Sequence, residues 1–423
     1  GPKPAVEAGP LIFRAGSAAS SGAWSIASCI AFRGVQGLGA GSIMATVNTL
    51  AGDLYDVQER ARVQGWLSSV WGLAAIVGPA IGGAFAEYSS WRWIFLINLP
   101  IGVIVLALIL SFLRERVSRL HPRINVAGSV LILGAVGMWI LGLLEGGQAW
   151  PWLSVPSLVT FVSAAALSVI LIMVERRAPE PVMPPWLWKR RVLLGANLSM
   201  IGMGLVMMGP ETYLPTFAQA SLGMGAIAAG FILAAMSIGW PLASALSGKL
   251  YLHIGFRNTG LIGAFIVVVA AAAFLAIPWP QPAWLLVTDP VALGAGFGLL
   301  STPMLVGIQS AVPWEQRGVV TGTNMFFRNL GQSLGAAVFG AIFNSALEGR
   351  LRHAPVPLPG NHQDILALLK TSALSARETG FIRGAINFAT RHIYVGLVVL
   401  ALATFCAVMI TPHRFPKTGE TAN

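Results

Sequence analysis

Long apolar runs dominate this chain and limit most strongly what it can fold into. Twelve runs of about 20 residues, the length that an α-helix needs to cross the hydrocarbon core of a bilayer, are separated by polar segments. Because lipid offers no hydrogen-bond partners to the backbone, such runs predict a bundle of membrane-spanning helices. The predicted spans cover residues 9–31, 34–52, 65–86, 92–113, 125–145, 155–174, 192–212, 224–247, 258–278, 284–305, 319–343 and 393–411.

The composition agrees with a membrane protein. Of 423 residues, 55% are hydrophobic and 10% are charged, whereas soluble domains have about a quarter of their residues charged. This comparison excludes an ordinary soluble enzyme and a disordered chain. The 48 glycines favour closely packed membrane helices. The two cysteines, Cys29 and Cys406, lie in apolar runs and predict neither a disulfide framework nor a metal site, and no cofactor is expected.

The basic residues predict the topology. The formal net charge is +11, but Lys and Arg occur in short clusters between the apolar runs, which argues against nucleic acid as a partner. Clusters at 114–123, 176–177 and 189–191 fall on one side of the membrane if the N-terminus is cytoplasmic. Since positive charge is enriched in cytoplasmic loops, we predict that both termini are cytoplasmic.

The sequence contains an internal repeat. GLGAG at 37–41 corresponds to GAGFG at 294–298, an offset of 257 residues, and Arg60 and Gly65 correspond to Arg317 and Gly322 at the same offset. Many secondary transporters are built from such repeats, with the substrate path at the interface between them. The alternative is a chance similarity between glycine-rich helices, which the shared register of the glycines and arginines disfavours.

An arginine lies at the start of the second predicted span. Arg33 is followed one turn later by Gln36. Charge within a span is costly and normally faces an interior cavity, so Arg33 could tune a proton-accepting carboxylate or hold an anion. The alternative is an arginine that reaches the outer membrane surface.

The third span contains a glycine and proline motif that is a candidate gate. It comprises Gly72 and then Gly78, Pro79, Gly82 and Gly83. Proline removes a backbone hydrogen bond and bends a helix, and the glycines permit close contact with a neighbour. A kinked helix with only a packing role is the alternative.

Two acidic residues within spans are candidates for proton coupling. Glu211 lies between Pro210 and Pro215, which predict a broken helix near a cavity, and Asp289 precedes Pro290. A titratable group inside a membrane is normally functional, although either residue could instead be solvated at a span end.

Polar residues share one face of the eleventh span. Asn324, Arg328 and Gln332 are spaced about one helical turn apart, which favours a cavity lining, with interhelical hydrogen bonding as the alternative. Together with Glu211, they form a predicted substrate path, which Tyr213 and Gln309 complete.

A longer outer loop is predicted at 346–390. It contains a proline-rich stretch at 355–359 and an apolar-periodic segment at 365–388. We expect that segment to form a helix that lies on the membrane surface or caps the protein, with a role in guiding substrate as the alternative.

Four motifs together resemble the major facilitator superfamily, and within it the fourteen-helix drug:proton antiporter branch. Arg33, Gln36 and Gly37 are similar to the R-x-x-Q-G motif of its fourth helix. Gly78, Pro79, Gly82 and Gly83 are similar to the antiporter motif of its fifth helix. WRWIFLINLPIG at 91–102 resembles the start of the sixth helix, and RNLGQSLG at 328–335 resembles the eleventh-helix motif.

The resemblance implies a fold. It is an all-α polytopic membrane protein, a two-half helical bundle with about 12 transmembrane helices present. Residues 1–116 would form an incomplete N-terminal half (family helices 3–6), 117–180 two extra linker helices, and 181–423 the C-terminal half (family helices 7–12). The family's first two helices, with the aspartate implicated in proton coupling, have no counterpart here, so we expect the sequence to be a fragment or a mis-started reading of a longer protein.

The resemblance also implies a function. We expect a proton-coupled efflux transporter of the multidrug type, a monomer in a bacterial inner (plasma) membrane, that exports hydrophobic or amphipathic small molecules by alternating access. A lipid exporter of the same fold and a truncated remnant without transport are the alternatives. A polytopic enzyme acting on lipid is disfavoured, because the His, Asp and Glu residues are not clustered in the sequence.

Overall fold

The computed structural model describes residues 2–112, 125–146, 149–277, 282, 284–353, 375–413 and 415. Nearly all of them are helical, and the single β-bridge in this part of the chain joins Gly146 to Trp150. The helices are α1 (Pro2–Ser21), α2 (Ile26–Leu54), α3 (Val57–Tyr88), α4 (Trp93–Leu96), α5 (Asn98–Phe112), α6 (Val126–Glu145), α7 (Val155–Arg177), α8 (Trp186–Lys189), α9 (Arg191–Leu222), α10 (Ala226–Ile254), α11 (Phe256–Ala276), α12 (Leu285–Ser310), α13 (Trp314–Leu351) and α15 (Ala376–Ile410).

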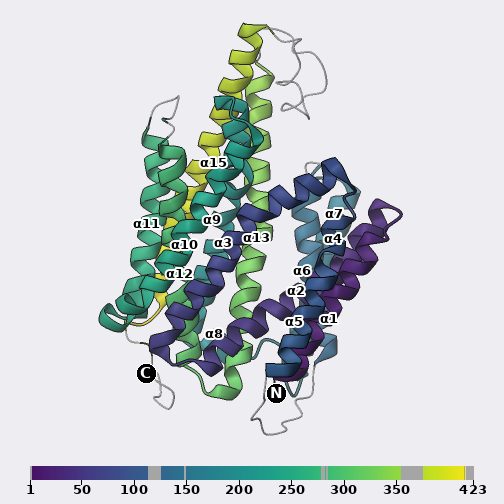
Figure 1. Cartoon of the computed structure of the whole chain (residues 1–423), viewed down its shortest axis with the longest axis vertical. Helices are drawn as coiled ribbons and strands as arrows, with labels where there is room; N and C mark the ends of the chain where they lie inside the picture. The colour runs from purple at the N-terminus through teal and green to yellow at the C-terminus, as the bar shows by residue number, and fades with distance from the viewer. Residues whose placement is uncertain are drawn as a thin grey trace.

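The helices form two groups joined by α2 and α3. Helices α9 to α13 and α15 pack into one bundle, whereas α1 packs against α2, α4 and α5, and α6 pairs with α7 (Figure 1). Helix α3 crosses between the groups and lies along α10, and α2 contacts α13. The start of α1 and the end of α15 lie toward the same end of the molecule in Figure 1.

Nine helical segments in the described part of the chain are long and apolar enough to cross a membrane. They cover Trp93–Phe112, Val126–Glu145, Val155–Arg177, Arg191–Leu222, Ala229–Ile254, Phe256–Ala276, Leu285–Ser310, Trp314–Leu351 and Ala376–Ile410. The spans predicted at 9–31, 34–52 and 65–86 fall in α1, α2 and α3, which are helical but not among the nine.

The predicted boundary between the first two spans is wrong. A span over 9–31 is expected from the sequence, but α1 ends at Ser21 and α2 begins at Ile26. Ser25 caps α2: its hydroxyl oxygen accepts from the Ser28 backbone N–H at 3.1 Å, and Ser28 Oγ accepts from the Ser25 N–H at 3.0 Å. This reciprocal cap satisfies N–H groups at the helix start and fixes the break there.

The outer loop predicted at 346–390 is too long. Helix α13 continues to Leu351, and α15 begins at Ala376, where Ser375 and Glu378 form a capping box. The part of the predicted surface helix after 375 is therefore the first part of α15, continuous with the last span, and 365–374 lie outside the described residues. With 38 residues, α13 is about 57 Å long, well beyond the roughly 30 Å of hydrocarbon, and its upper end projects with that of α15 (Figure 1).

Glycines bring α9 and α13 into backbone contact. A Cβ atom on Gly204 would overlap the carbonyl oxygen of Arg328, and one on Gly331 would overlap that of Ile201. A Cβ on Gly335 would lie 2.7 Å from the carbonyl oxygen of Leu205. Small residues at these positions therefore set the distance between the two helices and the register of the side chains that α13 presents.

We predict that Gly331→Ala separates α9 from α13 and lowers the melting temperature of the detergent-solubilised protein. Overpacking of this kind typically costs about 1–3 kcal/mol. Gly349→Ala is the matched control on the same helix, because a Cβ added there would meet no atom of the described chain within 4 Å. Equal melting temperatures for the two variants would contradict the packing role of Gly331.

Candidate functional site

A cavity of about 660 Å³ lies at the interface between the two helix groups. Helices α2 and α3 form one wall, and α9, α10, α12 and α13 form the other. The position agrees with the sequence prediction that a substrate path follows the interface between repeats, since α2 and α3 carry one copy and α12 and α13 the other.

The cavity lining is mostly apolar and adaptable. Five methionines and two tryptophans contribute to it, from five of the six helices: Met44, Met200, Met207, Met236, Met325, Trp71 and Trp240. Methionine is flexible and polarisable, so surfaces rich in it accept ligands of different shape. Ten of the 25 described lining residues have polar or charged side chains, a minority within an apolar surface, which is consistent with a small-molecule site.

Among the described residues, two charged side chains line this cavity, Glu211 from α9 and Arg328 from α13. They are close enough for their charges to interact, yet they are not among the ion pairs within 4.0 Å that the structure shows. The Nε atom of Arg328 is buried without a hydrogen-bond partner in the described chain. Gln332 lines the same wall, with its Nε2 atom 3.3 Å from the sulfur of Met207. Three residues predicted from sequence thus meet at one surface.

The local fold explains this arrangement. The contacts of Gly204, Gly331 and Gly335 bring α13 against α9 at the level of Arg328. The two prolines around Glu211 do not break the helix as predicted, because α9 is continuous from Arg191 to Leu222. Glu211 is therefore presented to the cavity from a helical wall.

Asn324, Tyr213 and Asp289 lie elsewhere and are not part of the cavity lining. Asn324 is fully buried and donates to Asn197 Oδ1 at 3.3 Å. This contact between α9 and α13 is the interhelical hydrogen bonding that the sequence left open as the alternative to a cavity lining. The Tyr213 ring packs against a phenylalanine ring of α13. Asp289 lies buried in the bundle of α9 to α15, where it accepts a hydrogen bond of 3.2 Å from Tyr394.

Arg33 and Gln36 form a separate polar cluster among the first helices. Arg33 donates to Gln36 Oε1 at 2.8 Å, and Gln36 donates to Ser17 Oγ at 2.6 Å. The guanidinium carbon of Arg33 lies 5.8 Å from the centre of the Phe95 ring. None of these contacts involves a carboxylate, and neither residue lines the cavity.

The predicted gating motif lies on α3. Gly72 lines the cavity and lies against α10, where an added Cβ would be 2.7 Å from the Ser237 carbonyl oxygen. Gly78 and Gly82 have no such neighbour within 4 Å among the described residues. Pro79 and Gly83 belong to the same helix, which continues to Tyr88. The gating role of the motif remains a prediction.

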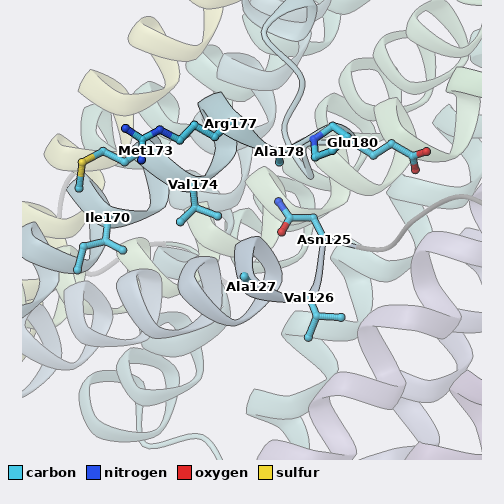
Figure 2. A pocket seen from close by; sticks show the side chains of 10 residues that line it. Asn125, Val126, Ala127, Ile170, Met173, Val174, Arg177, Ala178 and Glu180 are labelled. Atoms are coloured by element: carbon cyan, nitrogen blue, oxygen red, sulfur yellow. The ribbon is translucent and has the colours of Figure 1, made fainter.

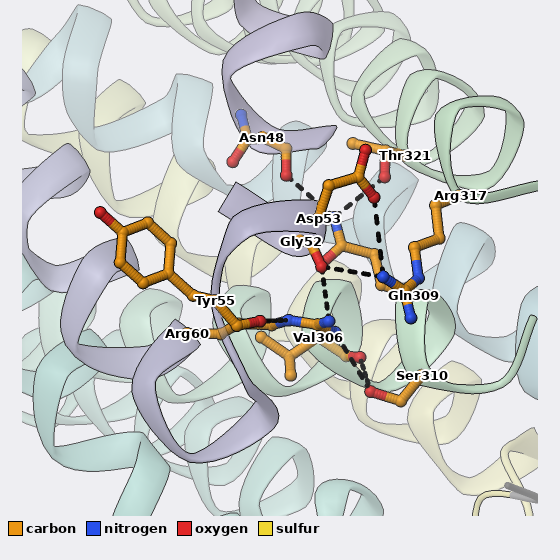
Figure 3. A network of polar contacts seen from close by, with 10 residues as sticks. All are labelled: Asn48, Gly52, Asp53, Tyr55, Arg60, Val306, Gln309, Ser310, Arg317 and Thr321. Carbon is orange, nitrogen blue, oxygen red and sulfur yellow. Dashed lines mark hydrogen bonds and ion pairs between the residues drawn. The ribbon is translucent and has the colours of Figure 1, made fainter. Parts of the chain in front are cut away.

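A network centred on the Gly52 carbonyl lies about one helical turn along α2 from Asn48, which lines the cavity (Figure 3). Both Arg60 and Arg317 donate to this oxygen, Arg317 at 3.1 Å. Arg317 also lies 3.6 Å from a carboxylate oxygen of Asp53, and Arg60 donates to Ser310 Oγ at 3.4 Å. Charged side chains from both repeats thus bind the opposite group of helices.

Gln309 strengthens the same connection. Its Nε2 atom donates to the Asn48 carbonyl and to Thr321 Oγ1, each at 3.0 Å. The side chain of Asn48 accepts a hydrogen bond of 3.0 Å from Gln64, and both Asn48 and Gln64 line the cavity. Gln309 therefore belongs to the polar network next to the cavity and does not line the cavity itself, although the sequence placed it in the substrate path.

The internal repeat explains the symmetry of the network. The offset of 257 residues relates Arg60 to Arg317 and Asp53 to Ser310. Each arginine contacts a residue in the other copy of the repeat, and these two residues occupy equivalent positions. Arg60 donates to Ser310, and Arg317 pairs with Asp53. The repeat identified the two arginines in the sequence, but Asp53 and Ser310 were missed because the residue types differ.

A second cavity of about 650 Å³ lies between the start of α6 and the end of α7, which the sequence predicts to be on the cytoplasmic side (Figure 2). Asn125 donates to Glu175 at 2.7 Å, and the other oxygen of Glu175 accepts from the Met183 backbone, which ties the two helices to the segment that follows. Arg177 and Glu180 extend in opposite directions in Figure 2. None of the residues predicted to function lines this cavity.

Sequence comparisons place these features among known transporters. The family model of the Major Facilitator Superfamily matches residues 1–336. Multidrug transporter protein MdtP of Bacillus subtilis is 32% identical over 86% of this chain and 68% of its own length. Multidrug resistance protein 3 of the same organism is 29% identical over 82% of this chain and 68% of its own length. Multidrug resistance protein Stp of Mycobacterium tuberculosis is 28% identical over 98% of this chain and 80% of its own length.

Structure comparison agrees at the level of the fold. The human organic anion transporter MFSD10 (TETRAN) superposes with a TM-score of 0.60 at 14% identity, over 96% of this chain and 77% of that one. The family match covers most of the sequence, and the helical bundle with its interfacial cavity is consistent with it. The chain is therefore an integral membrane protein that belongs to the Major Facilitator Superfamily.

Proposed function

We propose that this chain exports hydrophobic and amphipathic small molecules in exchange for protons, by alternating access. The observation that carries the proposal is the methionine- and tryptophan-lined cavity with Glu211 in its wall, beside a polar network that joins the two groups of helices. The multidrug transporters among its relatives support the same substrate class. A lining of this composition favours drug-sized apolar compounds over a single polar metabolite.

We assign the proton-carrying role to Glu211. A carboxylate in a membrane cavity can hold either a proton or the cationic group of a substrate, and this competition couples the two fluxes. Arg33, Gln36 and Asp289 are less suited, because they lie outside the cavity and are engaged by neighbouring side chains. Glu211 is accessible to both ligands.

The polar network supports a conformational role. Positive-inside topology would place Arg60 and Arg317 on the cytoplasmic side, so the observed state would be closed toward the cytoplasm. Opening that side requires the contacts of Gly52, Asp53 and Gln309 with the opposite group to break. Rocking of two repeats about a central site is the form of alternating access that this arrangement suits.

The finer organisation is part of the proposal. We place the protein as a monomer in a bacterial inner membrane with both termini cytoplasmic. Residues 1–116 and 181–423 would form the two halves, and 117–180 the linker helices. The start of α1 and the end of α15 lie toward the same end of the molecule in Figure 1, which supports this topology.

Glu211→Gln is predicted to abolish proton-driven efflux in everted vesicles while leaving substrate binding measurable. In the unaltered protein, binding of a cationic dye should weaken as the pH falls, because the proton neutralises the carboxylate that attracts it. The amide cannot be protonated, so this pH dependence should disappear in the variant.

Glu348→Gln is the control for that experiment, because Glu348 is exposed at the far end of α13, where it pairs with Arg352. The Glu348→Gln variant should retain proton-driven efflux and the pH dependence of dye binding. Unchanged proton-driven efflux in Glu211→Gln would remove Glu211 from the coupling mechanism.

Arg317→Ala is predicted to favour the state open at the network end. It removes the ion pair with Asp53 and the donor to the Gly52 carbonyl, contacts worth about 1–3 kcal/mol in a partly buried setting. Spin labels at Glu59→Cys and Glu315→Cys, both exposed beside the network, would report the change as a longer interlabel distance after Cys29 and Cys406 are replaced by serine.

Arg62→Ala serves as the matched arginine control for the distance measurement, since Arg62 is exposed on α3 two residues after Arg60. It should leave the distance distribution unchanged. The same distribution for Arg317→Ala would show that the network does not hold this end closed.

A further inference from the structure

The central cavity contains two opposite charges, and neither has a hydrogen-bond partner in the described residues. Glu211 and Arg328 project from adjacent helices into the same space. Arg328 is half-buried, its Nε atom is enclosed without a partner, and none of its nitrogens donates a hydrogen bond to the described chain. The two side chains influence each other's charge but are not joined as an ion pair within 4.0 Å.

Unpartnered charge in a membrane cavity is costly, so each group is a strong binding site for a complementary charge. The guanidinium of arginine presents several N–H groups in a fork that matches a carboxylate, which binds it through two parallel hydrogen bonds. Glu211 offers the complementary site for a cationic nitrogen. The other lining residues, rich in methionine and tryptophan, suit the apolar body that connects such groups.

We propose that Arg328 binds the anionic group of the substrate while Glu211 faces its cationic group, so that the cavity prefers zwitterionic amphiphiles. This inference rests on the proposed function and names the substrate class of the same site. A purely cationic substrate would leave Arg328 without a partner, and a purely anionic one would be repelled by Glu211. A zwitterion satisfies both groups at once.

The register of the two helices fits a ligand with separated charges. Arg328 packs at the level of Gly204, whereas Glu211 lies seven residues further along the same helix. At about 1.5 Å per residue, the two backbone positions are roughly 10 Å apart along α9. Both residues line the same cavity, and its volume of about 660 Å³ is in the range that holds a drug-sized aromatic ligand.

The test compares two probes that differ by one charge. One is a xanthylium dye that carries a free carboxylate, and the other is the methyl ester of the same dye, which is only cationic. Dissociation constants are measured by fluorescence anisotropy with the full chain in lipid nanodiscs. The variants are Arg328→Gln, Arg328→Lys and Arg350→Gln, and Glu211→Gln is measured in parallel.

We expect the unaltered protein to bind the carboxylate dye about tenfold or more tightly than the ester, as a charge-assisted pair predicts. Arg328→Gln should remove this preference without weakening the ester, whose binding also shows that the variant is folded. Arg328→Lys should keep part of the preference, because the charge remains but the fork is lost. Arg350→Gln, on the same helix outside the cavity, should behave as the unaltered protein.

Equal affinities for the two dyes in the unaltered protein, or a preference that survives Arg328→Gln, would overturn the inference. In either case, binding of the ester that weakens in Glu211→Gln would leave the proposed function intact. Failure of both dyes to bind would contradict the proposed function and this inference together.

Discussion

The convergence of Arg60 and Arg317 on the Gly52 carbonyl is the interaction on which the functional geometry depends. It holds α2 and α3 against α12 and α13 at one end and leaves the space between these helices as a cavity. A buried hydrogen bond from a charged donor is stronger than a neutral one, and these bonds reinforce the ion pair with Asp53. A connection made of a few polar contacts can also break as a unit, which a rocking transporter requires.

Glycine and methionine have different roles around the cavity: glycines allow close helix packing, and methionines form an adaptable part of the lining. Glycines such as Gly204 and Gly331 let α9 and α13 touch and thereby fix Arg328 at the cavity wall. Five methionines contribute to the remaining lining and can change conformation around a ligand. Rigid helix contacts therefore position the two charged groups, whereas the apolar surface stays tolerant of ligand shape.

Sequence reasoning predicted the helical bundle, the family and the meeting of Glu211, Arg328 and Gln332, because apolar runs and intramembrane polar residues are strong local signals. It did not predict that Asn324 pairs with Asn197, or that Gln309 bonds the Asn48 carbonyl, since both depend on which helices become neighbours. The methionine lining was also missed, because methionine in a span looks like any other apolar residue. The repeat was the one signal that could have located the polar network.

The central claim is that substrate occupies the cavity between α2, α3 and the α9 to α13 bundle. Substrate protection of a single cysteine tests it most directly. Ser68→Cys places a thiol in the cavity wall with little change in shape, in a chain whose Cys29 and Cys406 are replaced by alanine. A maleimide should label this thiol more slowly when a transported amphipathic dye is present. A labelling rate that the dye leaves unchanged would contradict the account.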